Sequence, residues 1–369
     1  MSSRSSEAFK ILHVVPALFG REGVLGGAER YALELARHMA EVAPTALVTF
    51  GDEARRETLG GLRVRVLGGA WYVRGQRTNP LSAGLLAEVL RADVVHCHQQ
   101  HVLSSSLAAA LCRVSGRRVF VSDLGGGGWD VSAYVSTDRW FQGHLHISEY
   151  SRRAAGHGDS ARAHVIMGGV DAEKFSPPES SDALVDEDDR PVLFVGRLMP
   201  HKGVDDLVEA LPEGMRLELI GQPYHEQFVT DLRRLAAGRD VRFRHDCDDA
   251  ALVEAYRRSL CVVLPSVYRT RYGDETRVPE LLGQTLLEGM ACGTPAVCTD
   301  VASMPEVVED GVTGFVVPPN DPDALREKLL WLRDNPARRA EMGAAARRRV
   351  LEKFTWPSVV RDCLEIYNS

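Results

Sequence analysis

The sequence predicts an α/β protein made of two domains, each built on a parallel sheet. Its 369 residues are enough for two domains of ordinary size, each with its own core. Short apolar, β-branched runs alternate with helix-period segments along most of the chain, which is typical of βαβ units. The alternation is interrupted by residues 179–189, which carry six acidic side chains and no basic one. Together, these observations predict two α/β domains joined near residue 180.

The first half of the chain contains a series of candidate strands and a clear first helix. The strands are expected at Ile11–Val15, Ala46–Phe50, Val64–Leu67, Val94–His98, Val119–Ser122 and Val165–Met167. A helix that begins near Ala28 separates the first two strands and places Tyr31, Leu35 and Met39 on one face. Residues 1–178 are therefore assigned to an N-terminal domain.

The acidic segment separates this domain from a second series of strands. It follows two prolines, and a stretch of this composition cannot bury a core, so residues 179–190 are expected to form an exposed linker. Further strands are expected at Val192–Val195, Leu217–Ile220, Val241–Phe243, Cys261–Leu264, Ala296–Thr299 and Phe315–Val317. Residues 191–353 are assigned to a C-terminal domain.

The composition is that of a soluble globular protein, with 44% apolar and 26% charged residues. The net charge of −7 argues against nucleic acid as a main partner. No apolar run approaches the roughly 18 residues that a membrane-spanning helix needs. The seven cysteines are scattered, which favours reduced thiols and a cytoplasmic location. The basic run Arg347–Arg349 is interpreted as a solvated helix face.

Glycines and cations follow the first expected strand of each domain, and open α/β sheets bind ligands at the carboxyl ends of their strands. Gly26 and Gly27 precede a helix, where backbone N–H groups can approach an anion, although a tight turn explains the same pair. In the second domain, Gly196 and Arg197 end a strand and Lys202 precedes the next helix. A guanidinium and an ammonium at one junction suit a diphosphate; two solvated surface residues are the alternative.

The most informative segment lies in the C-terminal domain. Gly283 can turn the chain into a helix that starts at Gln284, and the first N–H groups of this helix, with that of Thr285, then point towards a ligand. Glu280 lies just before the helix, and Glu288 lies about one turn inside it within an apolar run. One carboxylate can face the reacting end of a ligand, while the other accepts hydrogen bonds from a ribose diol.

With these motifs in this order, the sequence resembles glycosyltransferase family 4, a family of retaining enzymes with the GT-B fold. The resemblance covers almost the whole chain. Its marks are Gly26-Gly27-Ala28-Glu29, Gly196-Arg197-Leu198 with Lys202-Gly203, Gly169-Val170-Asp171 with Phe175, the E-x7-E pair Glu280 and Glu288, and the run from Glu309 to Phe315. It implies two Rossmann-like domains whose parallel sheets face each other across a cleft. It also implies that a final helix, residues 354–369, crosses back to the N-terminal domain.

The resemblance places the sugar donor on the C-terminal domain and the acceptor on the N-terminal domain. The implied donor-binding residues are Gly27, Gly196, Arg197, Lys202, Glu280, Leu282, Gly283, Gln284, Thr285 and Glu288. Arg197 and Lys202 would bind the diphosphate, and with Glu280, which would contact the hydroxyls of the transferred sugar, they are the implied catalytic residues. Glu288 would hold the ribose. Because the two cations replace a metal at the leaving group, no metal or other cofactor is expected.

The acceptor side departs from the family pattern. Where many relatives carry a histidine after the strand ending near Val121, this sequence has Ser122 and Asp123. Gly26, His98 and Asp123 are the candidate acceptor-side residues, and a capping role for Asp123 stays open. The donor side also departs from the pattern, because a leucine at position 282 replaces the aromatic residue that relatives carry after the first glutamate.

A histidine cluster and several other functions are weighed against this interpretation. Asp93, His96, His98 and His101 invite a zinc hypothesis, but no partner motif with ligand spacing follows them. A dehydrogenase would need G-x-G-x-x-G, and the glycines after the first strand have the wrong spacing. A GT-B nucleotide-sugar epimerase or hydrolase and a non-catalytic nucleotide-sugar-binding protein remain alternatives. The favoured activity is transfer of a hexosyl group, with retention, from a UDP-linked donor to a hydroxyl of a small acceptor, such as a sugar or an antibiotic-type natural product.

Overall fold

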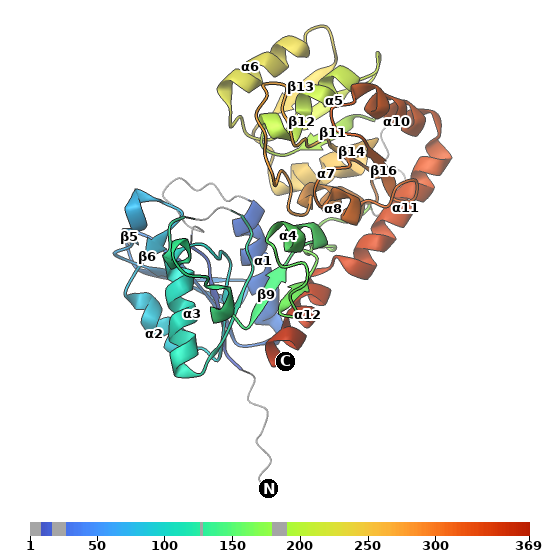
Figure 1. The fold of residues 1–369 in the computed structure, drawn as a ribbon. Helices are drawn as coiled ribbons and strands as arrows, with labels where there is room; N and C mark the ends of the chain where they lie inside the picture. The colour runs from blue at the N-terminus through green and yellow to red at the C-terminus, as the bar shows by residue number, and fades with distance from the viewer. Residues whose placement is uncertain (1–8, 17–26, 126–127, 179–189) are drawn as a thin grey trace. The chain divides into compact units, whose positions relative to one another are not determined.

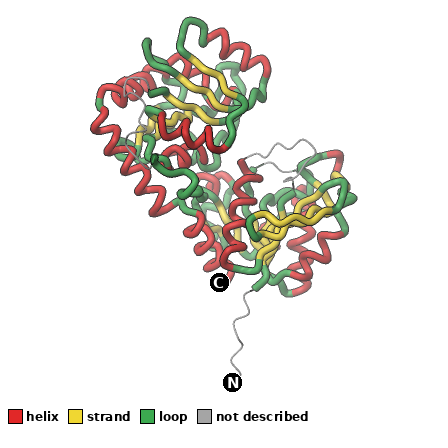
Figure 2. The backbone as a smooth tube through the Cα atoms, turned by 180° about the vertical axis from the view of Figure 1, so that it is seen from behind, coloured by secondary structure: helices red, strands yellow, loops and turns green. Residues whose placement is uncertain are grey.

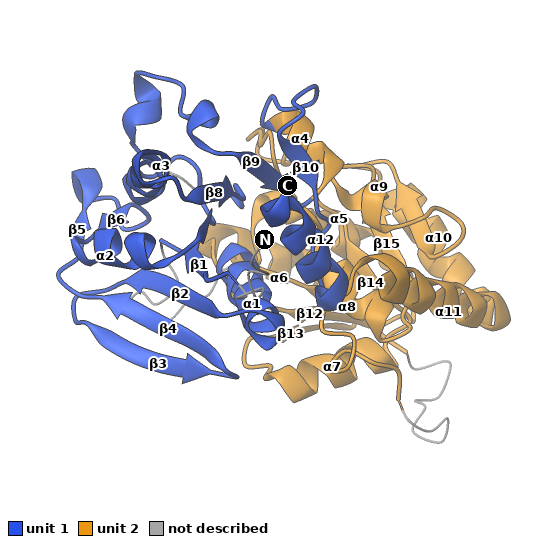
Figure 3. Ribbon diagram, turned by 90° about the horizontal axis from the view of Figure 1, so that it is seen from below, with its two compact units in different colours: residues 1–147, 155–169, 356–369 blue, residues 148–154, 170–355 orange. Residues whose placement is uncertain are grey.

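The computed structural model describes residues 9–16, 27–125, 128–178 and 190–369, which form two compact units. The first unit comprises Met1–Ile147, Ala155–Gly169 and Trp356–Ser369, and the second comprises Ser148–Ala154 and Val170–Thr355 (Figure 3). The C-terminal segment therefore belongs to the first unit. The chain passes into the second unit after residue 169, whereas the sequence analysis placed this boundary at 178. Of the expected linker, only residue 190 is described.

Eight strands form the sheet of the first unit, in the order β10-β9-β8-β7-β1-β2-β4-β3; β9 is labelled in Figure 1. They are β1 (Ile11–Val14), β2 (Thr45–Phe50), β3 (Arg55–Leu59), β4 (Leu62–Leu67), β7 (Val94–Cys97), β8 (Arg118–Val121), β9 (Gly143–His146) and β10 (Ala163–Val165). All neighbours pair in parallel except β3 and β4. A separate short hairpin joins β5 (Trp71–Tyr72) to β6 (Pro80–Leu81). Every residue of β1 is buried, as expected for a central strand covered on both faces.

The helices of the first unit pack in two pairs. They are α1 (Gly27–Val42), α2 (Gly84–Arg91), α3 (Leu103–Ser115) and α12 (Trp356–Asn368). Helix α1 contacts α12, and α2 contacts α3. The expected apolar face of α1 is confirmed, because Tyr31, Leu35 and Met39 are all buried. Since right-handed crossovers leave β1 in one direction and β7 in the other, α1 and α3 lie on opposite faces of the sheet.

The second unit contains a six-stranded sheet in which every neighbouring pair is parallel, in the order β13-β12-β11-β14-β15-β16. Figure 2 draws strands in yellow and the helices in red. Its strands are β11 (Val192–Val195), β12 (Leu217–Ile220), β13 (Val241–Arg244), β14 (Cys261–Leu264), β15 (Ala296–Thr299) and β16 (Gly314–Val317). Its helices are α4 (Glu149–Ala154), α5 (Val204–Ala210), α6 (Glu226–Leu235), α7 (Asp249–Arg258), α8 (Gln284–Ala291), α9 (Met304–Val307), α10 (Pro322–Asp334) and α11 (Pro336–Lys353).

Both sheets reverse their strand order beside their first strand. In the first unit β1 lies between β2 and β7, and in the second unit β11 lies between β12 and β14. The connections on either side of such a strand leave towards opposite faces, so a crevice opens at the carboxyl ends of the two central strands. Each unit therefore has one topological switch point, and the residues that follow its central strands are the candidates for function.

The sequence located most strands, but it missed several in the first unit and misassigned one basic run. The strands of the second unit agree with the prediction to within one residue, whereas β3, β5, β6 and β9 in the first unit were not predicted. The interpretation of the basic run on α11 as a solvated face is wrong: Arg347 donates to the carbonyl oxygens of Ala172, Phe175 and Ala291, and Arg349 donates to that of Val307. These arginines bind the helix to the ends of α8 and α9 and to the segment that contains Ala172 and Phe175, all in its own unit.

All seven cysteines are free thiols, and all but Cys247 are buried. Among the residues that the structure describes, no helix combines the length and apolar character needed to cross a membrane. The expected location of the protein stays a prediction.

Candidate active site

Two loops meet at the switch point of the second unit. The loop after β11 contains Gly203, whose φ of 63° suits glycine and whose added Cβ would lie 2.0 Å from the carbonyl oxygen of Pro265. Pro265 follows β14, and the backbone N–H of Val267 donates to the carbonyl oxygen of His201 at 2.9 Å. This close approach fixes the position of Lys202, which lies between His201 and Gly203.

Lys202 forms an ion pair with Glu280 across this junction. The two side chains are only 13% and 12% exposed. The hydroxyl of Ser266 donates to the same carboxylate oxygen, Oε1, at 3.2 Å, and Ser266 is itself fully buried. Within the described part of the chain, Oε2 of Glu280 has no hydrogen-bond partner. The structure therefore brings together two predicted residues, separated by 78 positions in the sequence, and adds a serine that no sequence motif marks.

Arg197 lies at the end of β11 with an exposed side chain. Its guanidinium lies over the ring of Tyr224, 5.2 Å from the centroid, and forms no ion pair with any described residue. Burial, followed by the positive charge of Lys202, lowers the pKa of His201, and the charges of Arg197 and Glu280 act on it as well, in opposite directions. His201 is therefore neutral at pH 7, and positive charge at this junction resides on Arg197 and Lys202.

Helix α8 begins at the same edge of the sheet. Gly283, with φ 85° and ψ 52°, turns the chain into the helix at Gln284 as predicted. The N–H groups in the first turn of an α-helix have no acceptor within the helix, and this end carries a partial positive charge. Gln284 and Thr285 are half-buried. The side chain of Leu282 is only 4% exposed, so the backbone of Leu282 is better placed than this side chain to meet a ligand.

Glu288 lies one turn further along α8 and is only 4% exposed. Its Oε2 accepts a hydrogen bond of 2.8 Å from the hydroxyl of Tyr256 on α7, and Tyr256 is fully buried. The carboxylate is thus held by a side chain that sequence reasoning missed, because no motif marks Tyr256.

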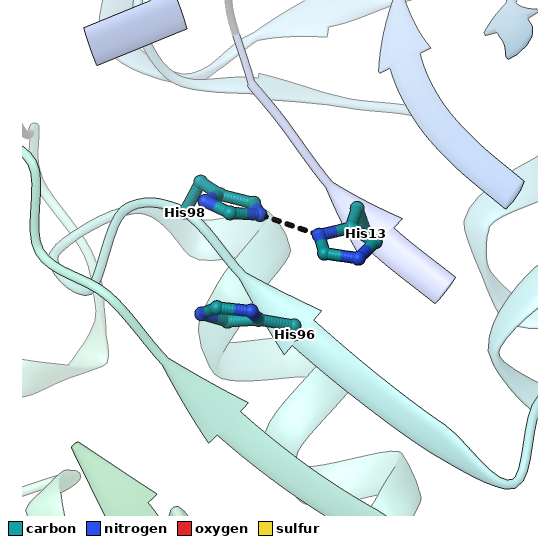
Figure 4. A group of neighbouring side chains, drawn as sticks. All are labelled: His13, His96 and His98. Atoms are coloured by element: carbon teal, nitrogen blue, oxygen red, sulfur yellow. Dashed lines mark hydrogen bonds between the residues drawn. The ribbon is translucent and has the colours of Figure 1, made fainter. Parts of the chain in front are cut away.

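The switch point of the first unit holds three buried histidines (Figure 4). Nδ1 of His13 on β1 lies 2.8 Å from Nε2 of His98, which follows β7. His96 on β7 lies beside them and uses both ring nitrogens, one with the hydroxyl of Ser122 at 2.9 Å and one with that of Tyr367 on α12 at 2.6 Å. The C-terminal helix therefore completes this histidine cluster.

Burial keeps this cluster neutral. Desolvation lowers the pKa of His13 from 6.5 to about 3, and it lowers the pKa values of His96 and His98 in the same direction. The set Asp93, His96, His98 and His101 is not assembled as one group. The Asp93 carboxylate accepts from the backbone N–H of Lys10, and His101 is exposed near Ser132. Both nitrogens of His96 are occupied by hydroxyls, so His96 packs against the hydrogen-bonded His13–His98 pair through ring contacts, whereas Nε2 of His13 and Nδ1 of His98 have no hydrogen-bond partner among the described residues.

The other acceptor-side candidates follow β8 and precede α1. Burial raises the pKa of Asp123, and His101 and the backbone N–H groups of Gln100 and Gly125 act in the opposite direction. Asp123 therefore accepts backbone hydrogen bonds as a cap would, within reach of histidines. Gly27 opens α1, and an added Cβ would meet no atom within 4 Å. Gly26 lies outside the described residues.

Comparison with known proteins identifies the family. Residues 25–174 match the model of glycosyltransferase family 4, and residues 177–349 match that of the glycosyl transferases group 1. The chain is 30% identical over 315 residues to the alpha-maltose-1-phosphate synthase of Mycolicibacterium smegmatis, covering 75% of this chain and 79% of that protein. It is 35% identical over 224 residues to a GDP-mannose-dependent alpha-(1-6)-phosphatidylinositol monomannoside mannosyltransferase of the same organism, covering 57% of this chain and 58% of that protein.

Solved structures agree on the fold. A crystal structure of Anabaena HepE in complex with UDP and glucose matches with a TM-score of 0.74 at 18% identity, covering 97% of this chain and 98% of that one. Sucrose-phosphate synthase from Thermosynechococcus elongatus matches with a TM-score of 0.72 at 18% identity, covering 98% of each chain. The chain belongs to the family 4 glycosyltransferases. It has the GT-B fold of two Rossmann-like domains, and it is a retaining enzyme that transfers a sugar from a nucleotide sugar.

Proposed function

We propose that the chain transfers a hexosyl group from a UDP-sugar to a hydroxyl of a small acceptor, such as a sugar or an antibiotic-type natural product. The observation that carries the donor site is the half-buried pair of Lys202 and Glu280, which lies where the loops after β11 and β14 meet. UDP is favoured because HepE, which has the same fold, binds UDP and glucose.

We assign the donor diphosphate to Lys202 and Arg197. The ammonium of Lys202 has three N–H donors, so it can keep its bond to Glu280 and still donate to a phosphate oxygen. Arg197 offers a planar fork from an exposed position, suited to a second phosphate oxygen. The first N–H groups of α8 would add donors, because a helix N-terminus favours an anion. Together these groups would supply the positive charge that a metal ion provides in other transferases.

In this proposal, Glu280 and Glu288 bind different parts of the donor. Ser266 and Lys202 hold Oε1 of Glu280, which leaves Oε2 to accept from the hydroxyls of the transferred sugar. Tyr256 fixes the carboxylate of Glu288 in a buried position, and we assign this group to the ribose diol. Each carboxylate is thus oriented by protein donors before the ligand arrives, which reduces the entropy lost on binding.

The proposed reaction keeps the configuration of the sugar. The acceptor oxygen forms a bond to the anomeric carbon on the face from which the diphosphate departs, and the bond from this carbon to the phosphate oxygen breaks. The acceptor proton passes to the departing phosphate oxygen. Lys202 and Arg197 stabilise the charge that develops there. We assign Gly26, His98 and Asp123 to the acceptor side, where a neutral His98 can donate or accept one hydrogen bond.

Two measurements test this function. Thermal shifts with UDP-, GDP-, ADP- and dTDP-sugars should single out one nucleotide, since ligand at 100 times its Kd adds about 2.7 kcal/mol of stability. The chosen donor is then incubated with candidate acceptors, and the anomeric proton of the product is followed by NMR. A product with the donor's configuration is expected. A donor that is only hydrolysed or epimerised with every acceptor would contradict transfer, and binding without turnover would indicate a non-catalytic binder.

A further inference from the structure

A second group of histidines in the first unit combines nitrogen and carboxylate ligands. Asp138 lies in a short 3₁₀ helix (Asp138–Trp140), His144 lies on β9, and His157 lies in the segment before β10. One ligand atom from each of the three lies within 4.8 Å of the others. Bonds of about 2.1 Å to a central ion would put ligand atoms up to about 4.2 Å apart. Small rotations of these side chains would therefore close a three-ligand site.

The hydrogen bonds of this group leave the right atoms for an ion. Nε2 of His144 lies 3.1 Å from the carbonyl oxygen of Asp138, and Nδ1 of His157 lies 3.0 Å from Nε2 of His146. If each donates its N–H in these bonds, Nδ1 of His144 and Nε2 of His157 carry lone pairs. Metal-binding histidines have this arrangement, in which the second nitrogen donates to a protein acceptor and fixes the ring.

A buried ring nitrogen of His144 is independent evidence that this group of residues binds a ligand. His144 is 2% exposed, and its Nδ1 has no hydrogen-bond partner among the described residues. A buried polar atom without a partner costs free energy and calls for an explanation. Burial lowers the pKa of His144 to about 4, so at pH 7 the imidazole is neutral. A neutral ring is a metal ligand and carries no charge to attract an anion.

Negative charge on the neighbouring carboxylates favours a cation. Burial opposes ionisation of Asp138, but hydrogen bonds from Ser136 and Gln100 lower the pKa of its carboxyl. Nε2 of Gln100 donates to Oδ1 at 2.5 Å and the Ser136 hydroxyl donates to Oδ2 at 3.1 Å, so each oxygen keeps a lone pair. Asp123 is close enough to His157 for their charges to interact. The group therefore offers anionic oxygen and neutral nitrogen ligands in one place.

We propose that Asp138, His144 and His157 bind a divalent transition-metal ion of the zinc type. Two imidazoles and a carboxylate are a ligand set that zinc accepts, with a fourth position for water. The ion would tie β9 to the segment that leads into β10, on either side of the residues (148–154) that the chain contributes to the second unit. Its role in this proposal is structural, so it is independent of the proposed transfer reaction.

Metal binding to the full, untagged chain tests the proposal. After dialysis against a chelator, the protein is titrated with Zn²⁺ by calorimetry and with Co²⁺ by visible absorption, which reports the ligand geometry of the bound ion. One equivalent of either ion per chain is expected, together with a rise in the melting temperature on adding Zn²⁺. Asp138→Asn and His157→Gln should each weaken binding at least about 10-fold. Both positions are only half-buried, so the variants are expected to fold.

His164→Gln is the matched control, since His164 is a half-buried histidine on β10 outside the group. It should bind the ions as the wild-type chain does. Circular dichroism and the metal-free melting temperature show whether each variant is folded. The proposal is overturned if the wild-type chain binds no stoichiometric ion, or if both site variants bind as tightly as His164→Gln. Because no sugar transfer is measured, failure here leaves the proposed function untouched.

Discussion

The switch points of the two units share a strand order but differ in chemistry. In each sheet the first strand lies between two strands that the chain reaches in opposite directions: β1 lies between β2 and β7, and β11 lies between β12 and β14. At the second unit's crevice, Lys202 and Glu280 are charged, half-buried and paired. At the first unit's crevice, His13, His96 and His98 are fully buried and held neutral.

The difference shows how one topology is adapted to two purposes. A charged pair keeps its charge only where some solvent and opposite charge remain, because full burial of an ion is costly. Half-buried cations suit the binding of an anionic ligand such as a diphosphate. Neutral histidines can be buried completely because they carry no charge; His13 and His98 share a hydrogen bond, and His96 bonds to the hydroxyls of Ser122 and Tyr367. This second arrangement gives the first unit a rigid, uncharged polar cluster beneath the ends of β1 and β7.

Removing the cation of the second switch point should have the largest effect. Lys202→Ala is expected to lower kcat about 100-fold or more, because the leaving diphosphate loses a preorganised positive charge. This fall corresponds to a loss of about 3 kcal/mol of transition-state stabilisation. Steady-state kinetics measure this loss. Lys353→Ala, at the exposed end of α11, is the control and should be neutral. Near-normal turnover of the Lys202 variant would remove this residue from the site.

Lowering the pH should reduce the stability of the first unit more than that of the second. The pKa of His13 is about 3 in the folded chain against 6.5 unfolded, so the unfolded state binds more protons between these values. The stability from this histidine is complete above pH 6.5 and falls as the pH drops below it, by about 2 kcal/mol, or roughly 30-fold in the opening equilibrium, at pH 5.

Hydrogen exchange measured by mass spectrometry at pH 7 and pH 5, corrected for intrinsic rates, reports this change. Peptides covering β1 and β7 should lose protection, while those covering β11 and β14 change less, because His201, which lies in the loop after β11, is only half-buried. Equal loss of protection in both sheets would show that the buried histidines do not set the response of the first unit to acid.

Removing a single hydroxyl group from the second unit should have a smaller effect on activity. Tyr256→Phe removes the hydrogen bond to the carboxylate of Glu288 and is expected to raise the KM for the donor about 10-fold with little change in kcat, since a bond to a charged group contributes roughly 1.5–3 kcal/mol. Tyr272→Phe removes a comparable bond, to Asp231 on the exposed surface, and should leave both constants unchanged. If the two variants behave alike, Glu288 does not hold the ribose.

Chelation should have the smallest effect on catalysis. Dialysis against a chelator is expected to leave kcat within about twofold at temperatures well below unfolding, because Arg197 and Lys202 meet the charge of the diphosphate. The melting temperature is recorded in parallel, since loss of an ion from Asp138, His144 and His157 would lower it without touching the donor. Activity that disappears and returns with magnesium or manganese would contradict a metal-independent donor site.

The sequence predicted the elements of the second unit better than those of the first. Strands such as β11 and β14 are continuous apolar runs ended by glycine or proline, so their limits were visible. Strand β9 was missed because its sequence, Gly143 to His146, contains one apolar residue between two histidines. Its burial comes from neighbouring strands on both sides, which local patterning does not record.

Sequence alone determined the class of fold, the family and the positions of the strand ends where charged and glycine residues cluster. Local physics suffices for this, because βαβ periodicity and helix starts such as Gly283 depend on near neighbours. Only the tertiary structure decided which strand ends meet. In the folded chain Lys202 forms an ion pair with Glu280, and Tyr256 donates a hydrogen bond to Glu288. Tyr367, near the end of the chain, forms a hydrogen bond with His96. These contacts depend on strand order, and the same alternating pattern is compatible with several orders.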